Sequence, residues 1–121
     1  MSKHILSVSY DVSLLATRQM LLQQKGYSVT SCLGFSKAIE HCRKGGFDLF
    51  VLGHSIPASD KIALIEAFRG NCPAAILSLE RVGEEKVPSN FHVSPDNPEK
   101  FLRVVEEILA GGEERSQGRP A

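Results

Sequence analysis

A serine follows an apolar run in a setting that could support nucleophilic chemistry. The stretch Leu49–Pro57 reads LFVLGHSIP, and GHSIP is similar to the Gly-x-Ser-x-Gly turn that presents a hydrolase nucleophile between a strand and a helix. Asp60 and His92 follow Ser55 in the chain order that such a triad needs. However, proline takes the fifth position, where this turn needs a small residue, and His92 lies inside a predicted strand rather than on a loop. We therefore interpret Ser55 as a loop residue whose hydroxyl makes local hydrogen bonds.

The other residue types that carry chemistry show no diagnostic spacing. The four histidines and three cysteines match neither a metal site nor a dithiol redox motif. His54 is expected to be a partly buried structural residue, because neighbouring strand positions face opposite sides of a sheet. The cysteines are expected to be buried and reduced, as in cytosolic proteins. The segment SYDVS stands where a glycine-rich phosphate loop would follow the first apolar run, so the sequence predicts no nucleotide cofactor.

The elements that must position these side chains are strands and helices in alternation. Apolar runs at 5–8, 27–32, 48–52, 74–77 and 91–93 predict strands. Helices are predicted after Asp11, after Gly34, after Ser59 or Asp60 as N-cap, and from Pro98. The interval ERVGEEKVPSN, residues 80–90, is polar and broken by glycine and proline, which favours a loop or a single turn. This alternation predicts a parallel sheet in a three-layer α/β/α sandwich.

Length and charge limit the function classes. The chain has 121 residues, which predicts one domain, over residues 1–110, and a disordered tail rich in glycine and charge, over 111–121. Lysine plus arginine equals aspartate plus glutamate at 14 each, so nucleic-acid binding is not expected. No apolar run is long enough to span a bilayer, and none at the start is typical of a secretion signal. We therefore expect a cytoplasmic protein without membrane partners.

In open parallel sheets, ligands bind at the carboxyl ends of the strands. The residues expected there are Ser9, Tyr10, Asp11, Gly53, His54, Ser55, Ser78 and Ser94.

With these elements in place, the sequence resembles the receiver domains of bacterial response regulators, which share the flavodoxin-like fold of chemotaxis proteins. The resemblance runs from Lys3 to about Ala110, and it rests on the segments ILSVSYD, GYSVTSCLGFSKAI, FDLFVLGHSIPASD, PAAILS and FHVSPDNPEKFLRVV. It implies a five-stranded parallel sheet of order 2-1-3-4-5, with the fourth helix shortened or absent.

The resemblance also implies a site from which most of the chemistry is missing. A receiver accepts a phosphoryl group from a histidine kinase on an aspartate at the end of its third strand, where magnesium and a lysine offset the phosphate charge. Here the acceptor position is Gly53, the magnesium-binding acidic pair is replaced by Ser9 and Tyr10, and the lysine by Ser94. The phosphoryl-binding hydroxyl is retained as Ser78, and Phe91 takes the position of the switch aromatic.

These departures imply a degenerate, or pseudo-, receiver. We expect a stand-alone, non-enzymatic module of two-component phosphorelay signalling, which acts by protein–protein interaction without aspartyl phosphorylation or magnesium. The expected partner is a signalling protein such as a histidine kinase or an output protein, and a homodimer stays open. The alternative is a sensor of a small ligand or anion, bound in the vacated crevice by Ser9, Ser55, Ser78 and Ser94.

Overall fold

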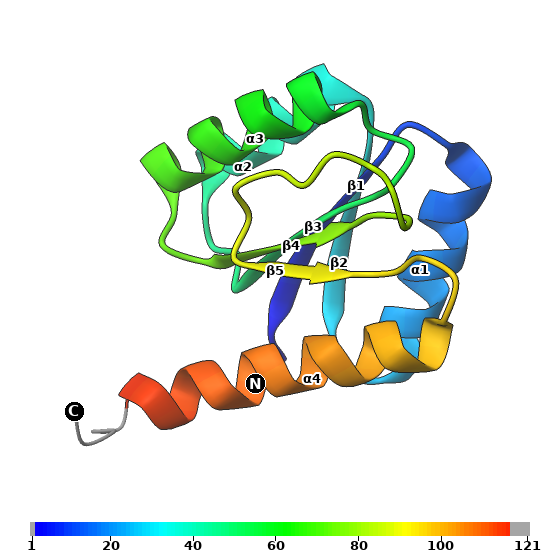
Figure 1. The fold of residues 1–121 in the computed structure, drawn as a ribbon. Coiled ribbons are helices and arrows are strands. Elements are labelled where there is room, and N and C mark those ends of the chain that lie inside the picture. The colour runs from blue at the N-terminus through cyan, green and yellow to red at the C-terminus, as the bar shows by residue number, and fades with distance from the viewer. Residues whose placement is uncertain (1, 117–121) are drawn as a thin grey trace.

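The computed structural model describes the backbone of residues 2–116 and the side chains of residues 2–110. They form a five-stranded parallel sheet between two layers of helices (Figure 1). The strands are β1 (His4–Ser9), β2 (Ser28–Leu33), β3 (Leu49–Leu52), β4 (Ala75–Leu79) and β5 (Phe91–Val93). The helices are α1 (Val12–Gln24), α2 (Phe35–Lys44), α3 (Ala58–Asn71) and α4 (Pro98–Ser116). The sheet order is β2-β1-β3-β4-β5, which confirms the predicted flavodoxin-like topology.

The core has two halves, one on each face of the sheet. Phe50 and Leu52 of β3 pack in the cluster that α2 and α3 cover, while Leu49 and Val51 pack in the cluster that α1 and α4 cover. All four side chains are fully buried. The unbroken apolar run of this strand therefore reflects burial on both faces, as expected for the centre of a parallel sheet.

The starts of α1 and α3 show how local sequence sets the helix boundaries. The Asp11 carboxylate accepts a hydrogen bond from the Leu14 backbone N–H at 3.0 Å, which confirms the predicted N-cap of α1. The prediction for α3 was wrong, because the helix starts at Ala58 and Pro57 is its N-cap. Pro57 is extended, with φ −61° and ψ 151°, and its carbonyl accepts the first helical bond, from Lys61. Ser59 and Asp60 therefore lie inside the first turn.

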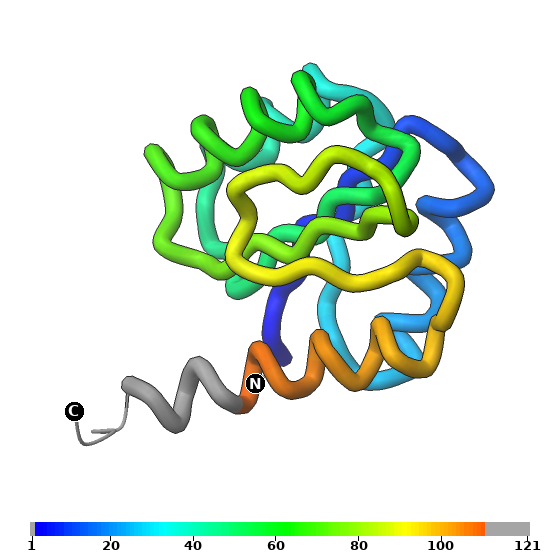
Figure 2. Tube along the Cα trace, viewed as in Figure 1, coloured from blue at the N-terminus to red at the C-terminus, as the bar shows by residue number. Residues whose placement is uncertain are grey.

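No helix forms among residues 80–90, between β4 and β5, as the sequence predicted. In Figure 2 the trace of this connection passes between α3 and β5, and side-chain contacts hold it on the α3 side of the sheet. Val87 is buried in the cluster that contains Phe68 of α3, and the Arg69 guanidinium donates to the Pro88 carbonyl. The connection therefore covers part of the sheet face that a helix would otherwise cover.

The end of the chain only partly falls within the structure. Helix α4 continues to Ser116, beyond the predicted domain boundary at residue 110, and residues 117–121 of the predicted tail lie outside the described residues. The boundary therefore stays a prediction. None of the helices in the described part of the chain has the length and apolar character needed to cross a membrane.

Candidate functional site

The carboxyl ends of the strands bring most of the expected residues to one edge of the sheet. Ser9 is the last residue of β1, Gly53 directly follows β3, Ser78 lies near the end of β4, and Ser94 follows β5. The Gly53 N–H donates to the carbonyl of Val8 at 2.9 Å, so β1 and β3 still touch at this edge.

The hydroxyl groups near β1 are satisfied by one another. The Ser9 and Ser55 hydroxyl oxygens lie 3.1 Å apart, and Ser55 also accepts a bond from the Tyr10 N–H at 2.9 Å. The Ser9 hydroxyl donates to the Asp11 carbonyl and accepts from the Asp11 N–H. Tyr10 donates its phenol proton to Asp60 at 2.8 Å. The polar groups on the β1 side of the crevice are therefore hydrogen-bonded to other groups of the protein.

The same contacts leave the hydrolase triad unassembled. Asp60 is engaged by Tyr10, and the His92 ring pairs with the Glu80 carboxylate at 2.9 Å. Ser55 thus makes the local hydrogen bonds expected of a loop residue.

A buried arginine occupies the space beside Gly53. Arg18 of α1 is only 6% exposed, and a Cβ atom built on Gly53 would lie 2.6 Å from its Nη1. Its Nη2 donates to His54 Nδ1 at 3.1 Å, whereas Nη1 has no hydrogen-bond partner. The guanidinium therefore stands where a side chain at position 53 would begin.

A buried lysine reaches the same edge from α3. The Lys61 ammonium donates to the Ser78 hydroxyl at 2.9 Å and to the Leu79 carbonyl at 2.8 Å. Ser78 in turn donates to the Glu80 carboxylate at 3.1 Å. Glu80 also accepts from the Val87 N–H at 3.3 Å. This chain of bonds links α3, β4 and the connection to β5.

Burial sets the electrostatics of both cations. It lowers the pKa of Arg18, which the charge of Asp11 opposes. Burial also lowers the pKa of Lys61, and there the charges of Glu80 and Glu84 oppose it. The pKa of His54 is lowered by burial and then by the Arg18 charge. Since a guanidinium can only donate, its bond to Nδ1 places the proton of neutral His54 on Nε2.

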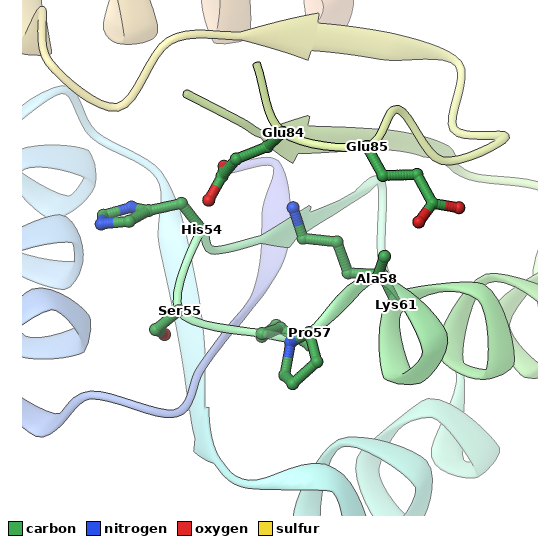
Figure 3. Close-up of a pocket in the computed structure, with 8 residues that line it drawn as sticks. His54, Ser55, Pro57, Ala58, Lys61, Glu84 and Glu85 are labelled. Atoms are coloured by element: carbon green, nitrogen blue, oxygen red, sulfur yellow. The ribbon is translucent and has the colours of Figure 1, made fainter. Parts of the chain in front are cut away.

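A hollow of about 260 Å³ opens beside Lys61. Its lining includes His54 and Ser55 from the loop after β3, and Glu84 and Glu85 from the connection between β4 and β5. In Figure 3 the Lys61 side chain rises from α3 into this hollow, between the loop and the two glutamates. The crevice is thus bordered by cations on one side and exposed carboxylates on the other.

The remaining expected residues lie apart from these cations. The Ser94 hydroxyl accepts from the Asp96 N–H at 3.2 Å, and Phe91 is half-buried against the α1 and α4 cluster. No group of three or more histidine, cysteine or acidic side chains gathers into a metal site anywhere in the part of the chain that the structure describes.

Arg18 and Lys61 were missed by the sequence analysis, although the sequence held a signal for both. Arg18 lies between the buried Leu15 and Leu22 on one face of α1. Lys61 stands three residues before the buried Leu64 and lies on the same buried face of α3. A charged residue at the centre of an apolar stripe is a candidate for a buried functional or structural cation.

Comparison with solved structures places the fold among receiver domains. The chain is similar to the chemotaxis protein CheY4 of Vibrio cholerae, with 22% identity, a TM-score of 0.72, and coverage of 90% of this chain and 100% of that one. The chain is also similar to the N-terminal domain of a response regulator/sensory box/GGDEF three-domain protein from Carboxydothermus hydrogenoformans, with 20% identity, a TM-score of 0.80, and coverage of 94% of this chain and 99% of that one. A chain from the complex of the histidine kinase ThkA with the response regulator TrrA has 19% identity and a TM-score of 0.75, and the match covers 88% of this chain and 98% of that one. No protein-family profile and no curated protein matches the sequence.

Proposed function

We propose that the protein is a receiver-like module of two-component signalling that acts by protein–protein interaction and is not phosphorylated on an aspartate. The receiver fold supports the signalling class. The absence of aspartyl phosphorylation is supported by the contact between Gly53 and Arg18. Position 53 offers no nucleophile, and the Arg18 guanidinium fills the space in front of it.

Magnesium does not fit these residues. Ser9 and Tyr10 supply no carboxylate, and their polar atoms are engaged with Ser55, Asp11 and Asp60. Magnesium is bound in proteins through carboxylates and water, and here a guanidinium charge lies beside Gly53. A divalent cation beside Gly53 would meet the like charge of Arg18, and neither Ser9 nor Tyr10 would offer it a carboxylate.

Asp48 and Asp60 flank β3 and its following loop and could be considered as substitute acceptors, but both carboxylates are engaged elsewhere. The Asp48 carboxylate accepts from the His4 N–H at 2.8 Å, at the opposite end of β1. Asp60 accepts the Tyr10 phenol proton. Neither side chain is free at the crevice.

Intact-mass measurement after incubation with acetyl phosphate and magnesium tests this proposal. The expected result is no stable adduct, while a phosphorylatable receiver treated in parallel gains one phosphoryl group. A magnesium-dependent gain of that mass on this protein would overturn the proposal.

A sensor of a small anion is the second candidate, and one observation favours it. Arg18 Nη1 is a buried cationic donor without a partner, and such a group is stabilised by an oxyanion. Against it, the hydroxyls of Ser9 and Ser55 are already hydrogen-bonded to each other. A thermal-shift series with phosphate, sulfate and nucleotides decides between the two, because a ligand of the folded state raises its melting temperature. An unchanged melting temperature with every anion would remove this candidate.

A further inference from the structure

A small cavity of about 80 Å³ lies between α1 and the start of α4, which pack on the same face of the sheet (Figure 1). Because Thr17 and Pro98 belong to its lining and are exposed, the cavity meets the surface between the two helices. Most of the lining is apolar and comes from α1, the end of β4 and the chain around the start of α4: Leu14, Leu21, Leu79, Pro95, Pro98 and Phe101.

Arg18 gives this cavity its charge. It is the only ionisable residue among those that line the cavity, and it is buried. Its Nη1 has no hydrogen-bond partner. The Asp11 charge acts on Arg18, but the Asp11 carboxylate is engaged by the Leu14 N–H and not by Nη1. A guanidinium in such surroundings binds an oxyanion more strongly than it would in water, because the local dielectric is low.

The size of the cavity limits the ligand. An apolar cavity of about 150 Å³ holds benzene, so a cavity of about 80 Å³ takes a short aliphatic tail rather than an aromatic ring. Nucleotides and aromatic acids are too large for it. An apolar lining with one cationic group therefore fits a small organic acid, with its tail among the leucines and its carboxylate on Arg18.

The guanidinium has a replaceable bond that lets it serve such a ligand. In the ligand-free structure Nη1 lies beside Gly53 and Nη2 donates to His54. His54 is half-buried, so water can take over that bond. The guanidinium then turns toward the cavity and exchanges a neutral acceptor for a charged one, which forms the stronger hydrogen bond. His54 also lines the hollow beside Lys61, so occupancy of the cavity would change the crevice.

We propose that the cavity between α1 and α4 binds a short-chain aliphatic carboxylate, held by the Arg18 guanidinium, and that binding releases His54 in the crevice. This inference goes beyond the proposed function, because it assigns a small-molecule site within the α1 side of the sheet. It also differs from binding of an inorganic anion, since the apolar tail contributes to affinity.

An NMR titration of the native protein with butyrate tests the proposal. We expect saturable shifts of the methyl signals of Leu14, Leu21 and Leu79 and of the His54 ring signals, together with a rise in melting temperature. Acetate lacks two methylene groups and should bind about tenfold more weakly. Butyramide keeps the tail without the charge, and phosphate keeps a charge without the tail, so both should bind about tenfold more weakly or worse.

The variant Arg18→Met should lose butyrate binding, because it removes the cation and keeps an unbranched apolar chain. The matched control Arg43→Met removes an exposed arginine from α2 and should bind butyrate like the native protein. Circular dichroism melting verifies that both variants are folded, and the ligand comparison on the native protein does not depend on either.

Three outcomes would overturn the site: no saturable shift with butyrate, equal binding of butyrate and butyramide, or undiminished binding to folded Arg18→Met. Methyl shifts without any change at His54 would overturn the release of His54. A phosphoryl adduct in the mass experiment would remove the proposed function but would leave these titrations unchanged.

Discussion

The substitution Arg18→Met isolates the energetic role of the guanidinium beside Gly53. It removes a buried cation whose Nη1 has no partner and keeps an unbranched apolar chain in its place. It also removes the bond from Nη2 to His54. Because His54 is only half-buried, water can replace that bond, whereas Nη1 is buried and has no protein partner.

The two contributions have different sizes. A buried donor without a partner costs about 1–3 kcal/mol, and replacing buried ions by apolar side chains is often neutral or stabilising. Replacing the Arg18–His54 hydrogen bond by a bond from His54 to water cancels part of this stabilisation. We therefore expect Arg18→Met to raise the free energy of unfolding by about 1 kcal/mol, which for a chain of this size raises the melting temperature by about 4 °C.

Combining this substitution with Gly53→Ala tests whether the two positions touch. A methyl group at position 53 would lie 2.6 Å from Arg18 Nη1 and 3.2 Å from the Val8 carbonyl oxygen. Gly53 is not among the glycines with positive φ, so the backbone itself accepts alanine. In the native background this overpacking should cost about 1–3 kcal/mol. In the Arg18→Met background the 2.6 Å contact with the guanidinium is gone, and the cost should fall by about 0.5 kcal/mol or more.

Urea unfolding of the four proteins in this double-mutant cycle gives the coupling energy. Additive effects of the two substitutions would refute the contact between Arg18 and position 53. A loss of stability on Arg18→Met would refute the reasoning about Nη1 and would mean that the guanidinium has a solvent or anion partner.

Three further perturbations address the other groups at this edge. Lys61→Met leaves the Leu79 carbonyl and Ser78 without their donor and should lower the urea unfolding free energy by about 1–3 kcal/mol; an unchanged midpoint would contradict the buried bonds. Glu80→Ala removes the acceptor of the Val87 N–H, so NMR should show faster hydrogen exchange of that amide. Unchanged exchange would contradict the hydrogen bond between Val87 and Glu80. His54 has a folded pKa below its ordinary value of 6.5, so its contribution is complete above pH 6.5 and is lost as the pH falls toward the folded pKa. His54→Leu should therefore flatten the dependence of stability on pH in that window, and an identical pH profile would exclude the shift.

The layers and strand order could be predicted because they depend on patterns that repeat along the chain. The apolar run of β3 and the alternation of strands with helices are local signals, and so is the Asp11 cap. The start of α3 could not be placed from cap preferences, because the extended chain ends at Pro57 and the helix starts at Ala58, before Ser59 or Asp60 could cap it. Cap propensity is a weaker constraint than the fixed φ of proline.

The contents of the crevice were harder to predict than its position. The topology brings Ser9, Gly53 and Ser78 to one edge, and that much follows from the parallel sheet. Which side chains fill the space depends on the reach of long residues from α1 and α3, which no local pattern encodes. Arg18 and Lys61 were therefore outside the expected set, although their positions among buried leucines marked them as unusual.

The contact between Arg18 and Gly53 also restricts the order in which substitutions could introduce a reactive acidic side chain at position 53. An aspartate introduced while Arg18 remains would stand against the guanidinium, which would pair with its carboxylate and lower its pKa. Such a carboxylate would act as a counterion before it could act as a nucleophile. Loss of Arg18 must therefore come first on any route to a reactive carboxylate at this position, because a single exchange at position 53 would lead only to an ion pair with Arg18.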